Sequence, residues 1–97
     1  MPRREYYVYL MANLARTLDI GVTGDLYRRV AQHKDGSGSS FTSQYHWNRL
    51  VYAEATQAVS AALLREKPLQ GWRRSRKIEL IEALNPEWRD LSADWSR

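Results

Sequence analysis

Residues 17–34 carry the pattern that most restricts how this chain can fold, because a strand, a turn and a helix follow one another without a gap. Every second residue from 18 to 22 is aliphatic, which is typical of a strand with one buried face. Thr23 or Asp25 then offers an N-cap for a helix over residues 26–34. The stretch predicts a sheet strand that passes directly into a helix packed on the same sheet.

The whole chain predicts a single small domain of mixed secondary structure. With 97 residues, it suits one domain with one modest core. We expect strands at residues 5–11, 17–22 and 49–54 and helices at 26–34, 56–67 and 72–84. Both faces of the first strand are apolar or aromatic, so we expect this strand to be covered on both sides. The order indicates an α/β (α+β) fold in which helices pack on a three-stranded sheet.

The first two strands are expected to form an antiparallel hairpin around a short connection at residues 12–16. In the register that sets Met11 opposite Thr17, Tyr9 lies opposite Asp19. The two side chains then share one face of the sheet. A slip of one residue would turn them to opposite faces.

Proline and glycine mark the expected ends of the second and third helices. Pro68 lacks an N–H and should end or kink the second helix, and Gly71 supports a break there. The third helix should stop near Asn85, because a residue before a proline avoids the helical region. The inward residues expected for the third helix are Ile78, Leu80, Ile81 and Leu84.

The charge distribution favours a polyanionic partner. The net charge is +4, and residues 65–77 hold six basic residues against one acid. Such a cluster indicates nucleic acid, although a solvated helix face gives the same pattern. The chain has no cysteine, which excludes a thiolate metal site and a Cys nucleophile and suits a cytoplasmic location. No apolar run approaches the roughly 18 residues of a membrane span, so no membrane partner is expected.

Two basic residues lie beside the apolar stripe of the first predicted helix, where apolar side chains are expected. Arg29 and His33 follow Leu26 by three and seven residues and so flank the apolar stripe. A buried guanidinium is costly, so Arg29 requires an anionic partner or a cleft. The structural alternative is an Arg29 that extends to the edge of the core beside a His33 bonded to a backbone carbonyl.

The second and third helices carry two more polar candidates. Glu66 falls on the apolar stripe formed by Val59, Ala62 and Leu63, where a carboxylate is uncommon unless it is paired or binds a cation. A salt bridge to Arg29 or to another basic residue is the alternative for Glu66, and a C-cap role is the alternative for Asn85. Arginine, histidine, tyrosine and a carboxylate on one small sheet together suit phosphodiester chemistry.

Several sequence blocks resemble the GIY-YIG nuclease family, in particular its small single-domain (UPF0213/URI-type) group. YVY at 7–9 and DIG at 19–21 stand where the family has its two signature tripeptides. The helix at 26–34 and the run FTSQY at 41–45 are typical of the group. The resemblance extends from about residue 6 to residue 91, which implies a single domain with a core at about 5–91 and a tail at 92–97.

The resemblance implies an antiparallel sheet and a metal-dependent DNA endonuclease with one Mg²⁺ or Mn²⁺. Tyr9 would assist in activating water, together with His33. Arg29 would stabilise the transition-state phosphate, Glu66 would hold the metal and Asn85 would support the site. Double-stranded or branched DNA is the expected partner, bound with low sequence specificity because lysine and arginine contact phosphates. The predicted DNA-binding residues are Arg28, Lys67, Arg73, Arg74 and Arg76. The oligomeric state is left open.

One position departs from the family pattern, since the second tripeptide of the family begins with tyrosine and this chain has Asp19. A carboxylate at that place adds negative charge where phosphate should bind, which would leave a nucleic-acid-binding module with weak or no catalysis. Alternatively, Asp19 joins Glu66 as a second metal ligand and takes part in the catalytic site. A protein-interaction domain with a solvated basic face is a third alternative.

Overall fold

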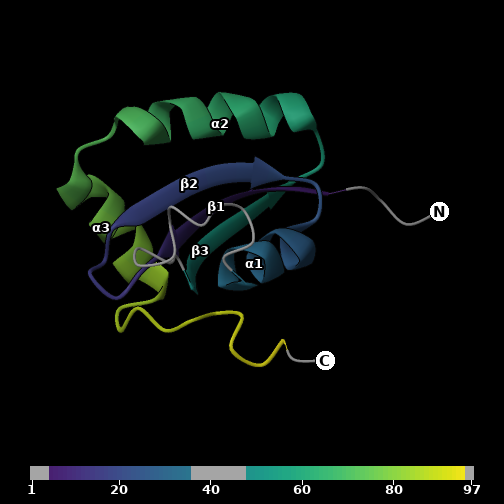
Figure 1. Ribbon diagram of the computed structural model, residues 1–97. Helices are drawn as coiled ribbons and strands as arrows, with labels where there is room; N and C mark the ends of the chain where they lie inside the picture. Colours follow the sequence, from purple (N-terminus) through teal and green to yellow (C-terminus); the bar gives the residue numbers. More distant parts are fainter. Residues whose placement is uncertain (1–4, 36–47, 96–97) are drawn as a thin grey trace.

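The computed structural model describes residues 5–35 and 48–95 (Figure 1). Its strands and helices, in chain order, are β1 (Tyr6–Ala12), β2 (Leu18–Thr23), α1 (Leu26–Asp35), β3 (Arg49–Thr56), α2 (Val59–Gly71) and α3 (Arg74–Leu84). The sheet has the strand order β2-β1-β3, and both pairings are antiparallel. The predicted α+β fold and element order are thereby confirmed. The run FTSQY at 41–45 lies outside the described residues.

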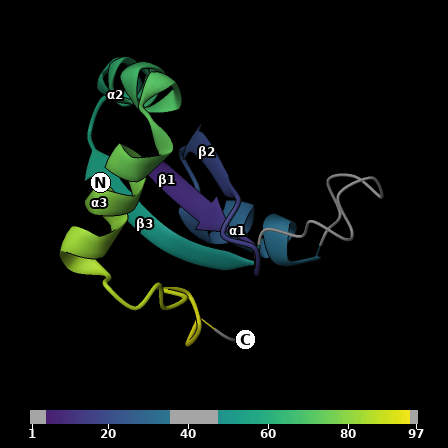
Figure 2. The ribbon, with the colours of Figure 1, turned by 90° about the vertical axis from the view of Figure 1, so that its left-hand side faces the viewer.

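Helices cover both faces of the sheet. Figure 2 shows α2 and α3 on one side of the strands and α1 on the other. On the α2 and α3 side, Leu10 and Ile20 pack with Leu69. On the α1 side, Tyr9 packs with Val30. Because β1 is the central strand, its side chains are buried on both faces, which explains its doubly apolar sequence.

The hairpin register differs from the predicted one by two residues. Tyr9 pairs with Gly21, not with Asp19. The reason is the connection, in which the side-chain oxygen of Asn13 accepts a hydrogen bond of 2.9 Å from the N–H of Thr17. Thr17 therefore belongs to the loop and not to the strand. A shift of two residues preserves the side-chain alternation, so Asp19 still lies on the same face as Tyr9.

Helix α2 runs through Pro68 and ends at Gly71, so the prediction that Pro68 ends the helix is wrong. The N–H that proline lacks would have bonded the carbonyl of Leu64. Leu64 is 74% exposed, so water can satisfy that carbonyl. Leu69, fully buried, continues the core-facing side of the helix beyond the proline.

The apolar stripe of α2 is also rotated from its predicted position. Ala62 is fully buried, but Val59 and Leu63 are 46% and 51% exposed. The rotation brings Arg65 to β3, where its Nε donates a hydrogen bond of 2.7 Å to Glu54. In α3, Ile78, Leu80 and Ile81 pack on the core as predicted, whereas Leu84, in the last turn, is 82% exposed.

The C-terminal segment runs along β3 and reaches α1. The N–H of Leu91 donates to the carbonyl of Leu50 at 2.7 Å, and Asp90 accepts from the N–H of Leu50 at 3.1 Å. Asp90 also accepts a hydrogen bond of 2.8 Å from Lys34 of α1. Trp95 stacks on Tyr27 of the same helix, with 5.7 Å between the ring centroids. The segment therefore ties α1 to the sheet.

No helix in the described ranges is long and apolar enough to cross a membrane.

Candidate active site

The centre of the candidate site is the side chain of Tyr9, which lies across the backbone of Gly21. Tyr9 is only 1% exposed. A β-carbon at position 21 would lie 2.6 Å from the Cζ atom of Tyr9 and 2.9 Å from its Cε2 atom. Such distances are sterically forbidden, so the strand pairing of these two residues requires glycine. The contact with the Tyr9 ring is therefore a physical reason why the tripeptide at 19–21 ends in glycine.

Arg29 joins Tyr9 from α1. Its Nε donates a hydrogen bond of 3.0 Å to the Tyr9 hydroxyl. Arg29 itself is exposed, and this bond raises the pKa of its guanidinium, so the group stays charged. Arg29 was expected to bond an anionic partner, but its Nε bonds the neutral phenol of Tyr9 instead. Because Arg29 is exposed, a phosphate can reach its guanidinium.

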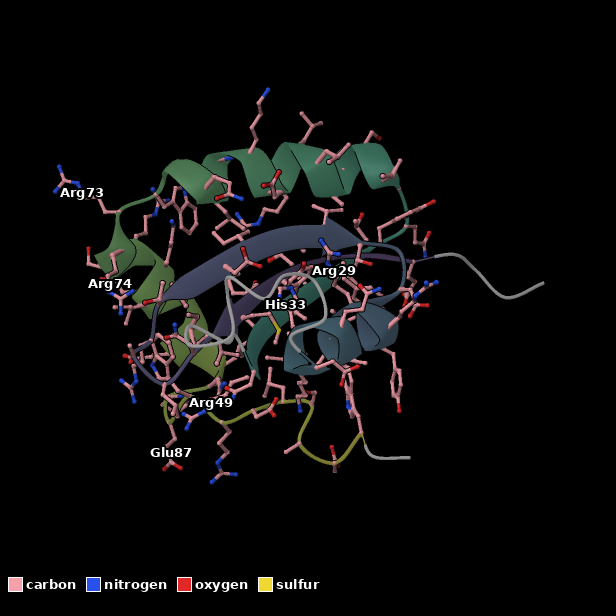
Figure 3. The ribbon with its side chains drawn as sticks, in the orientation of Figure 1. Arg29, His33, Arg49, Arg73, Arg74 and Glu87 are labelled. Atoms are coloured by element: carbon pink, nitrogen blue, oxygen red, sulfur yellow. The ribbon has the colours of Figure 1, made fainter. Side chains whose placement is uncertain are left out.

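His33 and Asp19 complete the group on this face of the sheet. The His33 ring meets the Tyr9 ring edge-on, with centroids 6.0 Å apart and planes at 68°. Its Nε2 lies 3.5 Å from Oδ2 of Asp19. The side chain of Asp19 is 40% exposed and that of His33 is 18% exposed, but Nε2 of His33 is itself buried. Figure 3 shows Arg29 and His33 beside each other over the sheet.

Burial controls the ionisation of two of these groups. Burial raises the pKa of the Tyr9 phenol, and the Arg29 guanidinium only partly opposes the rise. Burial likewise raises the pKa of the Asp19 carboxyl, with His33 and Arg29 acting in the opposite direction. At neutral pH the tyrosine is therefore a protonated phenol.

Glu66 approaches β2 from the other side of the sheet. Its carboxylate accepts a hydrogen bond of 2.6 Å from Gln70, whose amide also donates to the carbonyl of Ile20 at 3.3 Å. The predicted alternative, a salt bridge from Glu66 to Arg29 or to another basic residue, is not formed among the described residues, where the partner of Glu66 is Gln70. Because Gln70 bonds the backbone of β2, Glu66 lies beside this edge strand, whereas Asp19 contacts His33 on the α1 side of the sheet. Within residues 5–35 and 48–95, no three His, Asp or Glu side chains converge as a metal-binding group.

The side chain of Asn85 is buried and bonds backbone atoms of other segments. It is 6% exposed, and its side-chain amide donates to the carbonyls of Val51 and Arg89 at 3.1 and 2.9 Å. Its side-chain oxygen accepts a hydrogen bond from the N–H of Arg89 at 2.9 Å. The backbone N–H of Asn85 bonds Ile81, which confirms the C-cap position. Asn85 thus joins the end of α3 to β3 and to the C-terminal segment.

The predicted DNA-binding residues fall into two places. Arg28 lies on the exposed side of α1, next to Arg29 in sequence. Arg73 and Arg74 project where α2 meets α3 (Figure 3), and we call this region the basic turn. The basic turn consists of Lys67, Arg73, Arg74 and Arg76, all of which are exposed.

A network that the sequence patterns did not reveal supports the basic turn. The guanidinium carbon of Arg76 lies 3.9 Å from the ring centroid of Trp72, and that of Arg65 lies 5.4 Å from it. Arg65 also forms the ion pair with Glu54, which accepts a further hydrogen bond from Tyr52. Burial would raise the pKa of Glu54, but the bonds from Arg65 and Tyr52 outweigh it and lower that pKa. The rotation of α2 brings Arg65 to Glu54, and spacing along the sequence gave no signal for this contact between distant elements.

A separate pocket of about 190 Å³ lies between α1 and the C-terminal segment. Tyr27, Lys34 and Trp95 are among its lining residues, and none of the predicted site residues lines it. Its aromatic side chains already stack on each other. Tyr9, Arg29 and His33 therefore form a group separate from this pocket.

The fold and this group of side chains define a small α+β domain of nuclease type. The chain belongs to the GIY-YIG catalytic domain family, whose family model matches residues 5–79. The match includes Tyr9, Asp19, Arg29, His33 and Glu66 and ends before Asn85.

Similar proteins bear the name UPF0213. One from Natronomonas pharaonis is 34% identical over 77 residues, which cover 79% of this chain and 91% of that protein. One from Staphylococcus saprophyticus is 30% identical over 77 residues, or 79% of this chain and 94% of that protein. The solution NMR structure of a UPF0213 protein from Bacillus halodurans has the same fold, with a TM-score of 0.58 and 23% identity over 93% of this chain and 97% of that one.

Proposed function

We propose that this protein is a divalent-metal-dependent endonuclease that hydrolyses phosphodiester bonds in DNA with low sequence specificity. The observation that carries the proposal is the hydrogen bond between Arg29 and the buried Tyr9 hydroxyl. The bond holds a charged, exposed guanidinium in one orientation on a rigid sheet. A preorganised positive charge of this kind stabilises the negative charge that develops on the phosphate oxygens during hydrolysis.

Tyr9 acts mainly through Arg29. The resemblance to the family implied that Tyr9 assists in activating water, but a phenol that is 1% exposed and has a raised pKa is a poor general base at neutral pH. Its hydroxyl accepts the Arg29 hydrogen bond and so fixes the guanidinium. We therefore assign His33, whose ring packs beside Tyr9 and whose side chain is 18% exposed, the role of taking a proton from the attacking water.

Glu66 is the residue that would hold the metal ion. It is an accessible carboxylate at the open edge of β2, oriented by Gln70, and so supplies the hard oxygen ligand that Mg²⁺ or Mn²⁺ accepts. One protein carboxylate suffices where water and phosphate oxygens fill the other positions. When bound, the ion would neutralise phosphate charge and lower the pKa of a bound water.

The exposed arginines supply the contacts to DNA. Arg28 lies on α1 and the basic turn lies where α2 meets α3, so the two sets of proposed contacts lie on different parts of the surface. Contacts made by lysine and arginine to phosphates give affinity and orientation but carry no base information. Low sequence specificity follows from this composition.

The test is a nicking assay on supercoiled and branched DNA with Mg²⁺ or Mn²⁺. The native protein is expected to nick DNA and to lose this activity in EDTA, in Glu66→Ala and in Arg29→Ala. Glu79→Gln, which removes an exposed carboxylate from α3, is the matched control and should cleave normally. Cleavage that persists undiminished in Glu66→Ala would contradict the proposed site.

A DNA-binding module with weak or no catalysis is the second candidate. Asp19 favours this candidate. The Asp19 carboxylate is close enough to Arg29 to help raise the pKa of the guanidinium, and its negative charge would repel a phosphate bound there. In this case the native protein binds DNA without nicking it, and Asp19→Tyr gains nicking activity. Strong cleavage by the native protein would eliminate the candidate.

A further inference from the structure

We infer that Asp19 is a positioning residue for His33, which it holds in one orientation against Tyr9, and that it is not a metal ligand. The inference rests on the proposed function, because it assigns His33 the proton from water. Its first support is the contact itself, with Oδ2 of Asp19 at 3.5 Å from Nε2 of His33. The two residues come from β2 and α1, so the contact also joins the strand to the helix.

Asp19 and Glu66 belong to different sides of the sheet and have different partners. Met11, the strand partner of Asp19, packs on the α1 side of the sheet together with Tyr9 and Val30. Glu66 lies on α2, which packs on the opposite face, and its carboxylate is engaged by Gln70. A shared metal ion would require the two carboxylates to meet around the edge of β2. The arrangement instead gives each carboxylate its own partner.

A carboxylate beside one imidazole nitrogen determines how the ring serves as a base. It stabilises a proton on that nitrogen and sets the plane of the ring. In His33 a proton on Nε2 would face Oδ2 of Asp19 at 3.5 Å, with the ring edge against Tyr9. Partners of this type change activity by about 10- to 100-fold when they are removed.

The experiment compares Asp19→Ala, Asp19→Asn and the control Asp94→Asn, which removes an exposed carboxylate from the C-terminal segment. The chain has two histidines, so the ring ¹⁵N signals of His33 can be assigned by comparison with His46→Gln. Asp19→Ala should shift the His33 signals from the pattern of a ring protonated on Nε2 towards a mixture of the two tautomers. Asp19→Asn, which retains an acceptor oxygen, should shift them less, and Asp94→Asn should not shift them.

Two further readouts separate positioning from metal binding. Mn²⁺ affinity, measured on the protein alone, should change less than about twofold in Asp19→Ala and fall at least tenfold in Glu66→Gln. The maximal nicking rate should fall about 10- to 100-fold in Asp19→Ala with little change in KM, and Asp19→Asn should recover part of it.

The inference is overturned by unchanged His33 signals in Asp19→Ala, or by a loss of Mn²⁺ affinity in Asp19→Ala equal to that in Glu66→Gln. Absence of nicking by the native protein would instead refute the proposed function. The ring signals and the Mn²⁺ affinity would still decide whether Asp19 positions His33.

Discussion

The ring of Tyr9 and the backbone of Gly21 occupy adjoining positions on β1 and β2, and the space between them admits no β-carbon. The close approach buries the ring and sets the height of its hydroxyl above the sheet. Because Arg29 donates to that hydroxyl, the position of the guanidinium depends on a glycine in the neighbouring strand.

Replacing Gly21 by alanine should therefore displace Tyr9 and break its bond to Arg29. The added methyl group has no room in the native packing, so we expect a loss of about 1–3 kcal/mol of unfolding free energy. We also expect loss of nicking activity. Urea unfolding and the nicking assay measure the two effects. Gly71→Ala, where a β-carbon meets nothing within 4 Å, is the control for a glycine change without a clash. Native-like activity in Gly21→Ala would show that the Tyr9 position is not needed.

Arg29→Lys should reduce the maximal rate of nicking by about 10²- to 10³-fold, which is the usual effect of removing a preorganised charge donor. Lysine keeps the positive charge, but it lacks the planar set of donors with which a guanidinium can bond Tyr9 and a phosphate at the same time. Arg28→Ala is the informative comparison on the same helix. It should weaken DNA binding and leave the rate at saturating DNA largely intact. Equal effects of both substitutions on the saturated rate would argue against a special role of Arg29.

Neutralising the basic turn should make DNA binding less dependent on salt. Each lost phosphate contact lowers the slope of log affinity against log salt by about 0.9, so Arg73→Gln with Arg74→Gln should lower it by about two. Fluorescence anisotropy at several salt concentrations measures the slope on unrelated sequences. Arg89→Gln is the matched control, since Arg89 pairs with Glu87 on the C-terminal segment. An unchanged slope in the double variant would place the DNA elsewhere.

Asp90 should make the stability of the domain sensitive to acid. Burial opposes ionisation, but the bonds from Lys34, Ser92 and Leu50 prevail and lower the pKa of Asp90 below its ordinary value of 3.8. A lowered folded-state pKa means that the stabilisation is complete above the unfolded value and is lost as the pH falls through the folded value. Asp90→Asn should therefore cost about 1–2 kcal/mol at pH 7 and should lose less stability than the native protein between about pH 5 and pH 2.

Urea unfolding across this pH range tests the prediction for Asp90. Glu87→Gln is the control, because the Glu87–Arg89 pair is 72% and 76% exposed and should contribute little. Parallel pH profiles of Asp90→Asn and the native protein would contradict the assignment.

Periodicity and residue type along the chain were sufficient for much of the fold. The alternation in the first two strands fixes which side chains share a face, and this holds even though the register is shifted by two residues. The inward placement of Arg29 and His33 follows from helical spacing from Leu26 alone. These features are local, since each depends on residues within one or two helical turns or on one strand.

The sequence by itself therefore determined the order of elements, the face that carries Tyr9 and Asp19, and the helix that brings Arg29 and His33 to it. Only the tertiary structure decided the partners. It set Arg29 on Tyr9, Asp19 on His33 and Glu66 on Gln70 beside β2. It also rotated α2 so that Arg65 meets Glu54 while Leu63 is left in solvent. The reason is that such contacts join residues distant in the chain, and pairing energies between elements outweigh the local preference of any one helix.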